Sequence, residues 1–254
     1  MNRVQRRALG RLWRADLYRH LSGQGGLAAG LRAYRLVPGF RFMFWLRLAA
    51  MTRASSWPWR PAHLLARLMH KRLRWRFGIS IPYTTRIGPG FYIGHYGGIV
   101  VNEAAVIGRN CNISQGVTIG QLNRGARRGV PVIGDAVYIG PGAAIIGAVT
   151  VGSGCAIGAN AVVSRDLCPN AVAVGIPARV ISTRGSAGYV EFCDYPDAAS
   201  DLDADARADV QDDAQAGVKA DVHPDVHPDT HANTHANVDV DAHAAVDVDG
   251  GRHA

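Results

Sequence analysis

His95 is the residue of this chain best suited to acid–base chemistry. It is the one histidine in the stretch from Ile87 to Val163, where it follows Gly94 and precedes Tyr96 and two glycines. An imidazole titrates near neutral pH, so its neutral form can accept the proton of an attacking hydroxyl group. The residue types around His95 therefore predict a general base held at a turn.

The stretch around His95 repeats with a period of six residues. Its aliphatic positions are Ile87, Ile93, Ile99, Ile107, Ile113, Ile119, Ile133, Ile139, Ile145, Val151, Ile157 and Val163. Glycine often follows them, and glycine suits corners where the chain turns with unusual dihedral angles. A period of six is typical of a solenoid in which three short strands form each coil, whereas a β-sandwich spaces its strands by roughly 8 to 12 residues. We therefore predict a mainly β fold, a left-handed parallel β-helix.

The repeat is interrupted between Ile119 and Ile133, where residues 121–132 cannot follow a regular coil. The interrupting segment is polar, contains two glycines and carries Arg124, Arg127 and Arg128. We expect this segment to leave the solenoid as a loop, which either covers a site or is simply solvated.

Charge divides the chain into three parts. Residues 1–186 hold 25 lysines and arginines against four acids, a net charge of +21, whereas residues 187–254 hold three against 16, a net charge of −13. We expect a basic α-helical region over 1–80, the β-helix over 81–186 and an acidic tail over 187–254. The tail repeats aspartate, histidine, alanine and valine, so it should be disordered; its six histidines would at most capture divalent metal weakly.

The region 1–80 carries seventeen lysines and arginines against Asp16 alone. Arginines are interleaved with Leu, Phe and Trp over 40–47 and 64–76, which indicates amphipathic helices. Such helices suit a cap on the open end of the solenoid, and they equally suit contact with an anionic membrane surface. Arginines interrupt each apolar run before it reaches the ~18 residues of a spanning helix, and the first residues lack the apolar run of a signal peptide. We expect a cytoplasmic protein, peripheral to the inner face of the membrane at most.

The four cysteines, Cys111, Cys155, Cys168 and Cys193, show neither metal-binding nor disulfide spacing. We expect small buried thiols. The solenoid also holds too few histidines for a three-histidine metal site, so we expect no metal cofactor.

The stretch from Ile87 to Ser182 resembles the acetyl-coenzyme A dependent hexapeptide acyltransferases. The matching segments are 93–103, 116–120, 162–166 and 174–180. Within that group the chain looks like the serine acetyltransferases, and its basic N-terminal helices look like their exopolysaccharide branch, typified by the colanic acid biosynthesis acetyltransferases. The resemblance implies direct transfer of acetyl from acetyl-CoA to an acceptor hydroxyl, at a site between the subunits of a homotrimer.

The resemblance also implies roles for individual residues. His95 stands at the position of the general base. Coenzyme A would lie along the coils, with its phosphates at arginines, whose guanidinium groups pair well with phosphate. The implied cofactor-binding residues are Gly140, Gly142, Ala143, Gly158, Ala159, Arg165 and Arg179. The candidate acceptor-binding residues are Gly94, Tyr96, Asn102, Arg127 and Arg128.

The chain departs from the serine acetyltransferase pattern near the predicted base. That family has an aspartate fifteen residues before the base, another directly before it, and an Arg-His pair ahead of the proline that closes the loop. Here these positions are Ser80, Gly94, Gly129 and Val130. A buried amino acid needs partners for both of its charges, so these changes argue against serine as the acceptor. We expect a backbone carbonyl or Ser80, rather than Glu103, to orient His95.

The sequence therefore predicts an O-acetyltransferase that acts on a sugar hydroxyl of an exopolysaccharide or of its lipid-linked precursor. Two alternatives stay open: serine O-acetylation for cysteine biosynthesis, and a non-enzymatic basic scaffold. The scaffold would bind nucleic acid through the +21 body, but it leaves the residues around His95 unexplained, so we expect no nucleic-acid partner.

Overall fold

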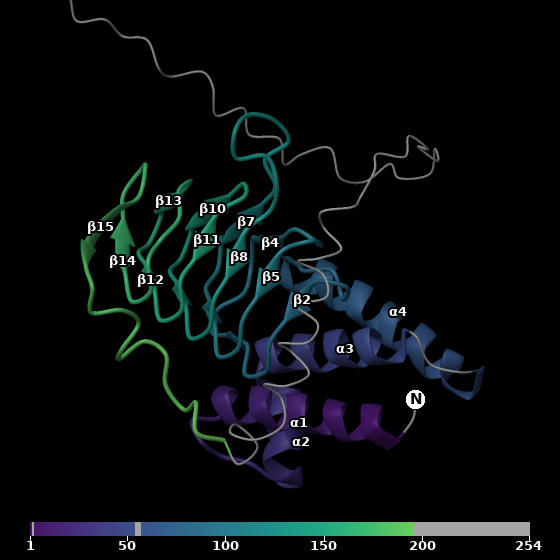
Figure 1. The fold of residues 1–254 in the computed structure, drawn as a ribbon. Helices are drawn as coiled ribbons and strands as arrows, with labels where there is room; N and C mark the ends of the chain where they lie inside the picture. Colours follow the sequence, from purple (N-terminus) through teal and green to yellow (C-terminus); the bar gives the residue numbers. More distant parts are fainter. Residues whose placement is uncertain (2, 54–56, 196–254) are drawn as a thin grey trace, which may run out of the picture. The chain divides into compact units, whose positions relative to one another are not determined.

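A computed structural model describes residues 1, 3–53 and 57–195 of the chain (Figure 1). The helices are α1 (Arg3–His20), α2 (Leu27–Leu36), α3 (Pro38–Thr52) and α4 (Arg60–Phe77), with a 3-10 turn, η1 (Trp57–Trp59), before α4. The strands are β1 (Ile79–Ser80), β2 (Arg86–Ile87), β3 (Tyr92–Ile93), β4 (Ile99–Val101), β5 (Val106–Ile107), β6 (Asn112–Ile113), β7 (Thr118–Gly120), β8 (Val132–Ile133), β9 (Tyr138–Ile139), β10 (Ala144–Ile146), β11 (Thr150–Val151), β12 (Ala156–Ile157), β13 (Val162–Val163), β14 (Val172–Val174) and β15 (Arg179–Ser182). Residues 196–254 lie outside the described residues.

The strands wind into coils whose three sides form three sheets. Face A contains β1, β4, β7, β10 and β13, face B contains β2, β5, β8 and β11, and face C contains β3, β6, β9, β12 and β14. All of these strands pair in parallel, and β15 adds to face C in the antiparallel direction. The prediction of a solenoid of parallel strands with N-terminal helices is confirmed.

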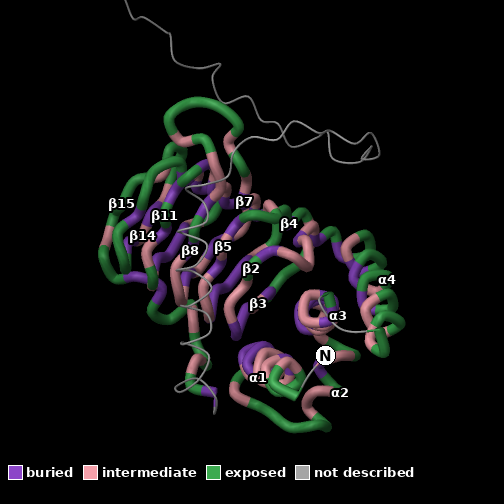
Figure 2. Tube along the Cα trace, turned by 45° about the vertical axis from the view of Figure 1, so that its right-hand side comes forward, coloured by how far each residue is buried: buried purple, intermediate pink, exposed green. Residues whose placement is uncertain are grey.

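The aliphatic residues of the repeat stack in columns inside the coils. The column of face C, for example, runs from Ile93 through Ile113 and Ile139 to Ile157, all paired in register and all buried. Neighbouring strands of a sheet lie about 4.8 Å apart, so each of these side chains contacts the one above it. Figure 2 shows the buried positions on the inner side of the coils.

The two-residue slip of the repeat is absorbed within β4. Ile99 pairs with Ile79, whereas Val101 pairs with Ile119. Both Ile99 and Val101 point into the core, and Val100 between them is exposed. One three-residue strand therefore joins two registers without breaking the column.

The glycines that follow the aliphatic residues on face B provide space rather than unusual dihedral angles, which corrects the expectation for these corners. A Cβ atom on Gly88 would lie 2.5 Å from the backbone nitrogen of Arg109, and one on Gly108 would lie 2.6 Å from the carbonyl carbon of Gly134. The left-handed conformation occurs two residues later instead, as at Asn110 with φ 58°. The close approach of successive coils excludes a side chain at the repeat glycine.

Local sequence fixes the limits of the helices that precede the coils. Pro38 opens α3 and Pro61 lies in the first turn of α4, where the missing N–H of proline costs no hydrogen bond. Helix α4 ends at Gly78, which adopts the left-handed conformation with φ 61°. The chain passes from there directly into β1. Over the described residues, no helix is long and apolar enough to cross a membrane.

Helices α3 and α4 cover the open end of the first coil. Apolar side chains from both helices join the core of the solenoid: Phe42, Met43, Leu46, Leu73 and Phe77. The first-coil residues in the same cluster include Ile79, Ile93 and Ile99. The helices therefore bury apolar surface that the end of a solenoid would otherwise expose.

A buried ion pair fixes α1 and α3 to the first coil. Asp16 is fully buried and accepts hydrogen bonds from Arg47 Nε and from the backbone N–H of Phe91, each at 3.0 Å. Arg47 also donates to the backbone carbonyls of Ile87 and Gly88. Loss of one partner from a buried pair costs about 3 to 5 kcal/mol, because the other charge is left uncompensated. The helices and the first coil are therefore held together by charge as well as by apolar packing.

Residues 187–195, expected to belong to a disordered tail, form an ordered segment that returns along face C to α1 (Figure 1). The ring of Tyr189 stacks on that of Tyr138 at 4.5 Å, and its carbonyl accepts from Asn112 Nδ2 at 2.7 Å. Arg19 of α1 donates from Nε to the carbonyl of Glu191 at 3.0 Å. Aromatic residues at 189, 192 and 195 make this segment unlike the rest of the tail. The prediction of disorder for residues 196–254 lies outside the described residues.

Two buried histidines make the stability of this fold dependent on pH. Burial lowers the pKa of His20 and that of His70 to about 4, because the charged imidazolium loses its hydration. In the unfolded chain both groups titrate near 6.5. Below that pH the unfolded chain binds protons that the folded chain does not. Their contribution to stability is thus complete above about pH 6.5 and is lost as the pH falls toward about 4.

We predict that lowering the pH from about 7 to about 5 reduces the free energy of unfolding by about 2 kcal/mol for each of these histidines. Urea denaturation at a series of pH values measures the slope. In His70→Leu, which removes one titrating group and keeps an apolar side chain, the slope should fall by about half. A slope that is the same in the variant and in the wild type would contradict this account of His70.

Candidate active site

His95 lies in the turn between β3 and β4, where face C meets face A, an edge that we call the C–A edge. Its side chain is exposed, and its ring makes no hydrogen bond within the part of the chain that the structure describes. Gly97 and Gly98, with φ of 110° and 66°, let the backbone reverse immediately after it. An accessible imidazole on a tight turn can reach both an acceptor hydroxyl and an acyl donor.

Two aromatic residues support this turn. Tyr96 contacts Phe77, the last residue of α4, with ring centroids 5.1 Å apart. Tyr92 lies beneath Gly94, where an added Cβ atom would be only 2.9 Å from Tyr92 Cε1. Any larger residue at position 94, such as the aspartate of the family pattern, would require the Tyr92 ring to move.

The groups expected to orient His95 are engaged elsewhere. Ser80 Oγ accepts a hydrogen bond from Arg74 at 2.8 Å. Glu103 accepts one from Thr84 Oγ1 at 2.6 Å, and it follows β4 at the far edge of face A. No backbone carbonyl bonds to the His95 ring within the described residues either, so the expected orienting contact is not formed in this chain alone.

The glycine and alanine residues predicted to bind coenzyme A lie on the same edge as His95, in later coils. Gly140, Gly142 and Ala143 are in the turn between β9 and β10, and Gly158 and Ala159 are in the turn between β12 and β13. With coils about 4.8 Å apart, these turns lie about 10 and 15 Å along the edge from His95. The side chain of Ala143 is fully buried and Gly140 is buried too, and their assignment as contact residues stays a prediction.

Backbone forms most of the surface of the C–A edge. Cβ atoms added to Gly98 and Gly116 would lie 3.4 and 3.3 Å from the Cα atoms of the next glycine in the column, Gly116 and Gly142 respectively. Gln115 also lies on this edge, between His95 and Gly142, and its carbonyl accepts from the Gly142 N–H. Sequence analysis missed Gln115, although the six-residue register places its turn directly above that of His95.

The two predicted phosphate-binding arginines lie in the last coils of the solenoid, and one of them, Arg165, lies on a different edge. Arg165 follows β13 at the edge where face A meets face B, which we call the A–B edge. Arg179 of β15 pairs with Val174, the last residue of β14 on face C, so its backbone lies beside the C–A edge. The two arginines line a cleft of about 250 Å³, whose other residues include Ser164, Asp166 and Ala178. The structure thus brings the two arginines together at one cleft, about three coils or 15 Å along the solenoid from His95. Arg165 also lies across face A from the C–A edge, roughly 10 Å for a three-residue strand.

The interrupting loop also belongs to the A–B edge. It spans residues 121–131, one residue shorter than predicted, because β8 begins at Val132. Leu122 and Gly129 exchange backbone hydrogen bonds of 2.9 Å, so the loop is a closed hairpin. Gly129 has φ 139°, a conformation that other residues rarely adopt, so the arginine of the family pattern would be strained there.

Charge pairing holds this loop against the later coils. Arg127 Nη1 lies 3.1 Å from both carboxylate oxygens of Asp166 and donates to the carbonyl of Ala148 at 3.3 Å. The backbone N–H of Thr150 and the Arg127 guanidinium lower the pKa of Asp166, so this exposed carboxylate stays ionised. Arg127 is therefore occupied in holding the loop, whereas the Arg128 side chain is exposed.

The candidate acceptor-binding residues divide between the two edges. Gly94 and Tyr96 adjoin His95 on the C–A edge. Asn102 follows β4 on the A–B edge, where Arg127 and Arg128 also lie. Its Nδ2 donates a hydrogen bond of 3.4 Å to Oε1 of Gln121 in the loop. One copy of the chain does not bring these two groups together.

Thiols and metal ligands add nothing to either edge. Cys111 and Cys155 are buried, and burial raises the pKa of Cys111 to about 12. Cys168 is exposed, which corrects the expectation that it is buried. Within the described ranges, no group of three or more His, Cys, Asp or Glu side chains is arranged to hold a metal ion.

Comparison with known proteins gives a consistent set of relatives. The family model described as bacterial transferase hexapeptide (six repeats) matches residues 131–165. The serine acetyltransferase of Synechococcus elongatus is 33% identical over 156 residues, which cover 61% of this chain and 62% of the relative. That of Bacillus subtilis is 34% identical over 174 residues, which cover 65% of this chain and 80% of the relative. The chain belongs to the serine acetyltransferase family of hexapeptide-repeat acyltransferases.

Solved structures of this family have the same fold. Soybean serine acetyltransferase complexed with serine superposes with a TM-score of 0.58 at 33% identity, over 69% of this chain and 70% of that one. A serine acetyltransferase in complex with CoA superposes with a TM-score of 0.56 at 27% identity, over 69% and 70%. The chain spans 62% of the length of the Synechococcus relative, so the similarity covers only part of that protein.

These relatives overturn the prediction of an exopolysaccharide acceptor. The matched relatives and solved neighbours are serine acetyltransferases, and none supports the exopolysaccharide branch. The prediction relied on four substituted positions, two near His95 (Ser80 and Gly94) and two in the loop (Gly129 and Val130). A charged residue that is missing at one position of the sequence does not show that the site lacks a partner for serine, because another residue of the assembly can supply that partner.

We predict that His95→Ala lowers the release of free thiol from acetyl-CoA by about a hundred- to ten-thousandfold, the usual contribution of a general base. The exposed side chain makes no bond that folding needs, so the variant should keep the wild-type unfolding midpoint. His63→Ala, which removes an imidazole from α4, is the matched control and should retain activity. Equal rates for His95→Ala and the wild type would exclude His95 as the base.

Proposed function

We propose that this protein transfers an acetyl group from acetyl-CoA to the hydroxyl of L-serine, with His95 as the general base. The observation that carries the proposal is the exposed imidazole of His95, on one edge with the backbone-lined turns of Gly142, Gly158 and Ala159, in a member of the serine acetyltransferase family. The use of acetyl-CoA, an intracellular metabolite, makes a cytoplasmic location part of the same proposal.

In the proposed reaction His95 acts twice. Its neutral imidazole accepts the hydroxyl proton as the serine oxygen attacks the thioester carbonyl, and a new C–O bond forms as the C–S bond breaks. The resulting imidazolium then gives this proton to the departing thiolate. The products are O-acetylserine and free coenzyme A, with no acyl-enzyme. A neighbouring residue need only hold the serine hydroxyl within hydrogen-bonding distance of the ring.

The donor is proposed to lie along the C–A edge. The pantetheine arm carries amides, which can bond to backbone groups where no side chain intervenes, as at Gly142 and Gly158. The phosphates need cations, and Arg165 and Arg179 line one cleft in the last coils, with Arg179 beside the C–A edge. Asn102 and Arg128 lie on the A–B edge, across face A from His95, so they would reach an acceptor beside His95 only from a different copy of the chain.

We therefore propose a homotrimer in which the C–A edge of one protomer faces the A–B edge of the next. This arrangement would unite His95 and Tyr96 with the neighbour's Asn102, Arg128 and Glu103. Arg128 could pair with the serine carboxylate and Glu103 with its ammonium group, replacing the partners that the family pattern places elsewhere. We also propose that the coils are left-handed, and that the chain divides into a helical region over 1–80, the β-helix over 81–186 and a tail over 187–254.

The proposed acceptor is tested by offering L-serine and acetyl-CoA to the purified full-length protein. We expect release of free thiol and formation of O-acetylserine, with D-serine and glucose as matched hydroxyl compounds that react far more slowly. Mass spectrometry of the product identifies the acetylated atom. Thiol release that is no faster with L-serine than without an acceptor would overturn serine as the substrate.

A further inference from the structure

Helix α4 carries a second apolar stripe on the side that faces away from the solenoid. Its inner side is buried between Ala66 and Phe77 against the first coil. Leu64, Leu68 and Trp75 are spaced by four and seven residues, so they share the opposite side of the helix. They are 67%, 62% and 80% exposed, and Figure 2 shows the outer side of α4 as exposed. A helix that packs through one face does not need such a stripe on the other.

Basic residues border this stripe on both sides. At 3.6 residues per turn, roughly 100° each, Arg67 and Lys71 lie on one flank and Arg72 and Arg76 on the other. All four are exposed, and α4 contains no acidic residue. The one acid of residues 1–80, Asp16, is buried and paired with Arg47. The described part of the helical region therefore offers this face no acidic partner.

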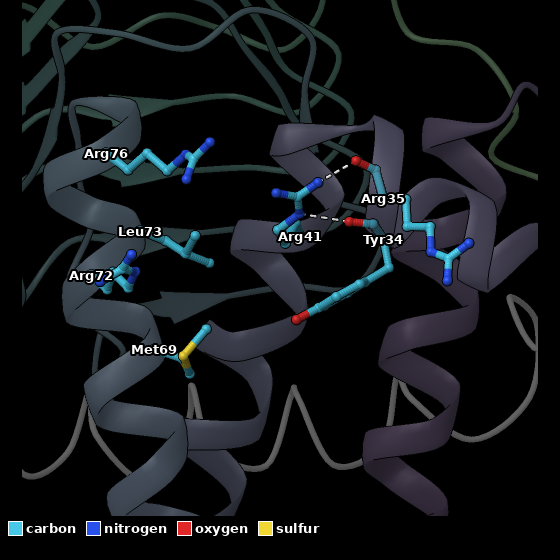
Figure 3. A pocket seen from close by; sticks show the side chains of 7 residues that line it. All are labelled: Tyr34, Arg35, Arg41, Met69, Arg72, Leu73 and Arg76. Carbon is cyan, nitrogen blue, oxygen red and sulfur yellow. Dashed lines mark hydrogen bonds between the residues drawn. The ribbon is translucent and has the colours of Figure 1, made fainter.

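A pocket adjoins the same face (Figure 3). It has a volume of about 330 Å³ and is lined by Tyr34, Arg35, Arg41, Met69, Arg72, Leu73 and Arg76. Arg76 extends from α4 toward Arg41 on α3. Arg41 donates to the carbonyls of Tyr34 and Arg35, and its guanidinium lies 5.6 Å from the centre of the Tyr34 ring. Four arginines and no acid line the pocket, which is the chemistry of a phosphate site.

We propose that the outer face of α4, with this arginine pocket, binds the surface of an anionic phospholipid bilayer. The stripe of Leu64, Leu68 and Trp75 enters the boundary between headgroups and acyl chains, and the pocket receives a headgroup phosphate. The flanking arginines and lysine stay in the headgroup layer, as they do in interfacial amphipathic helices. This contact is peripheral and requires no spanning segment.

The combination of apolar and cationic groups selects a bilayer over other occupants. A soluble phosphate would use the pocket but would leave the stripe exposed. A second copy of the chain, docked through the same face, would bring two basic surfaces into contact, because a two-fold contact pairs each patch with itself. The acidic tail supplies charge but contains few large apolar residues to cover leucine and tryptophan.

Cosedimentation of the full-length protein with vesicles tests this proposal. We expect binding to vesicles of phosphatidylcholine and phosphatidylglycerol, and little binding to phosphatidylcholine alone. The double variant Arg72→Gln/Arg76→Gln should bind about 30-fold more weakly, since each surface cation contributes about a factor of five or six. Leu64→Gln/Leu68→Gln should bind about a hundredfold more weakly. Each variant should keep the wild-type unfolding midpoint, because the substituted side chains are exposed.

Matched controls come from the far end of the solenoid, where Ile181→Gln and Arg184→Gln change one exposed apolar residue and one exposed cation. Both should bind vesicles as the wild type does. Equal binding to neutral and anionic vesicles, or equal losses in the controls, would overturn the proposal. Three further results would overturn it. The first is binding of inorganic phosphate through Arg72 and Arg76 without binding of vesicles. The second is a leucine variant that loses self-association rather than vesicle binding, and the third is vesicle binding that appears only after residues 196–254 are removed.

Discussion

The close spacing of successive coils is the constraint on which the rest of this structure depends. Parallel strands about 4.8 Å apart bring equivalent residues of neighbouring coils into direct contact. Inside the coils this favours columns of isoleucine and valine. At the corners it excludes side chains, so that Gly88 and Gly108 have no room for a Cβ atom. The same spacing leaves backbone as the surface of the edge that carries His95. One geometric requirement thus produces both the core and a ligand-accessible edge.

A solenoid built in this way has open ends, and the helical region closes the first of them with charge as well as apolar packing. The Asp16–Arg47 pair satisfies backbone groups of the first coil that have no strand beside them, among them the carbonyls of Ile87 and Gly88 and the N–H of Phe91. Because α4 buries one side against this coil, its other side is free to carry a second surface. The basic composition of residues 1–80 therefore serves two roles, one buried and one exposed.

The sequence was sufficient to predict the solenoid, because each coil repeats the same local contacts and the period survives in the residue types. It also indicated His95, which a single turn positions. The sequence did not show that Arg127 and Arg165 lie across face A from that histidine. The six-residue period also does not state which edge of a neighbouring copy would face the site. Average composition hid the aromatic residues that order residues 187–195. The acceptor was predicted wrongly, because the prediction relied on four positions of the sequence, whereas the relatives matched over more than half of the chain are serine acetyltransferases.

The central claim is that one active site is built from the C–A edge of one protomer and the A–B edge of another. Co-expression of His95→Ala chains with chains whose residues 123–128 are replaced by Asn-Gly, a turn that fits the Leu122–Gly129 pair, tests it directly. Each variant alone should be inactive. Mixed trimers purified through two different tags should regain roughly one third of wild-type activity, since each ring of three then holds one intact pair of edges. Mixed trimers as inactive as either parent would contradict the claim.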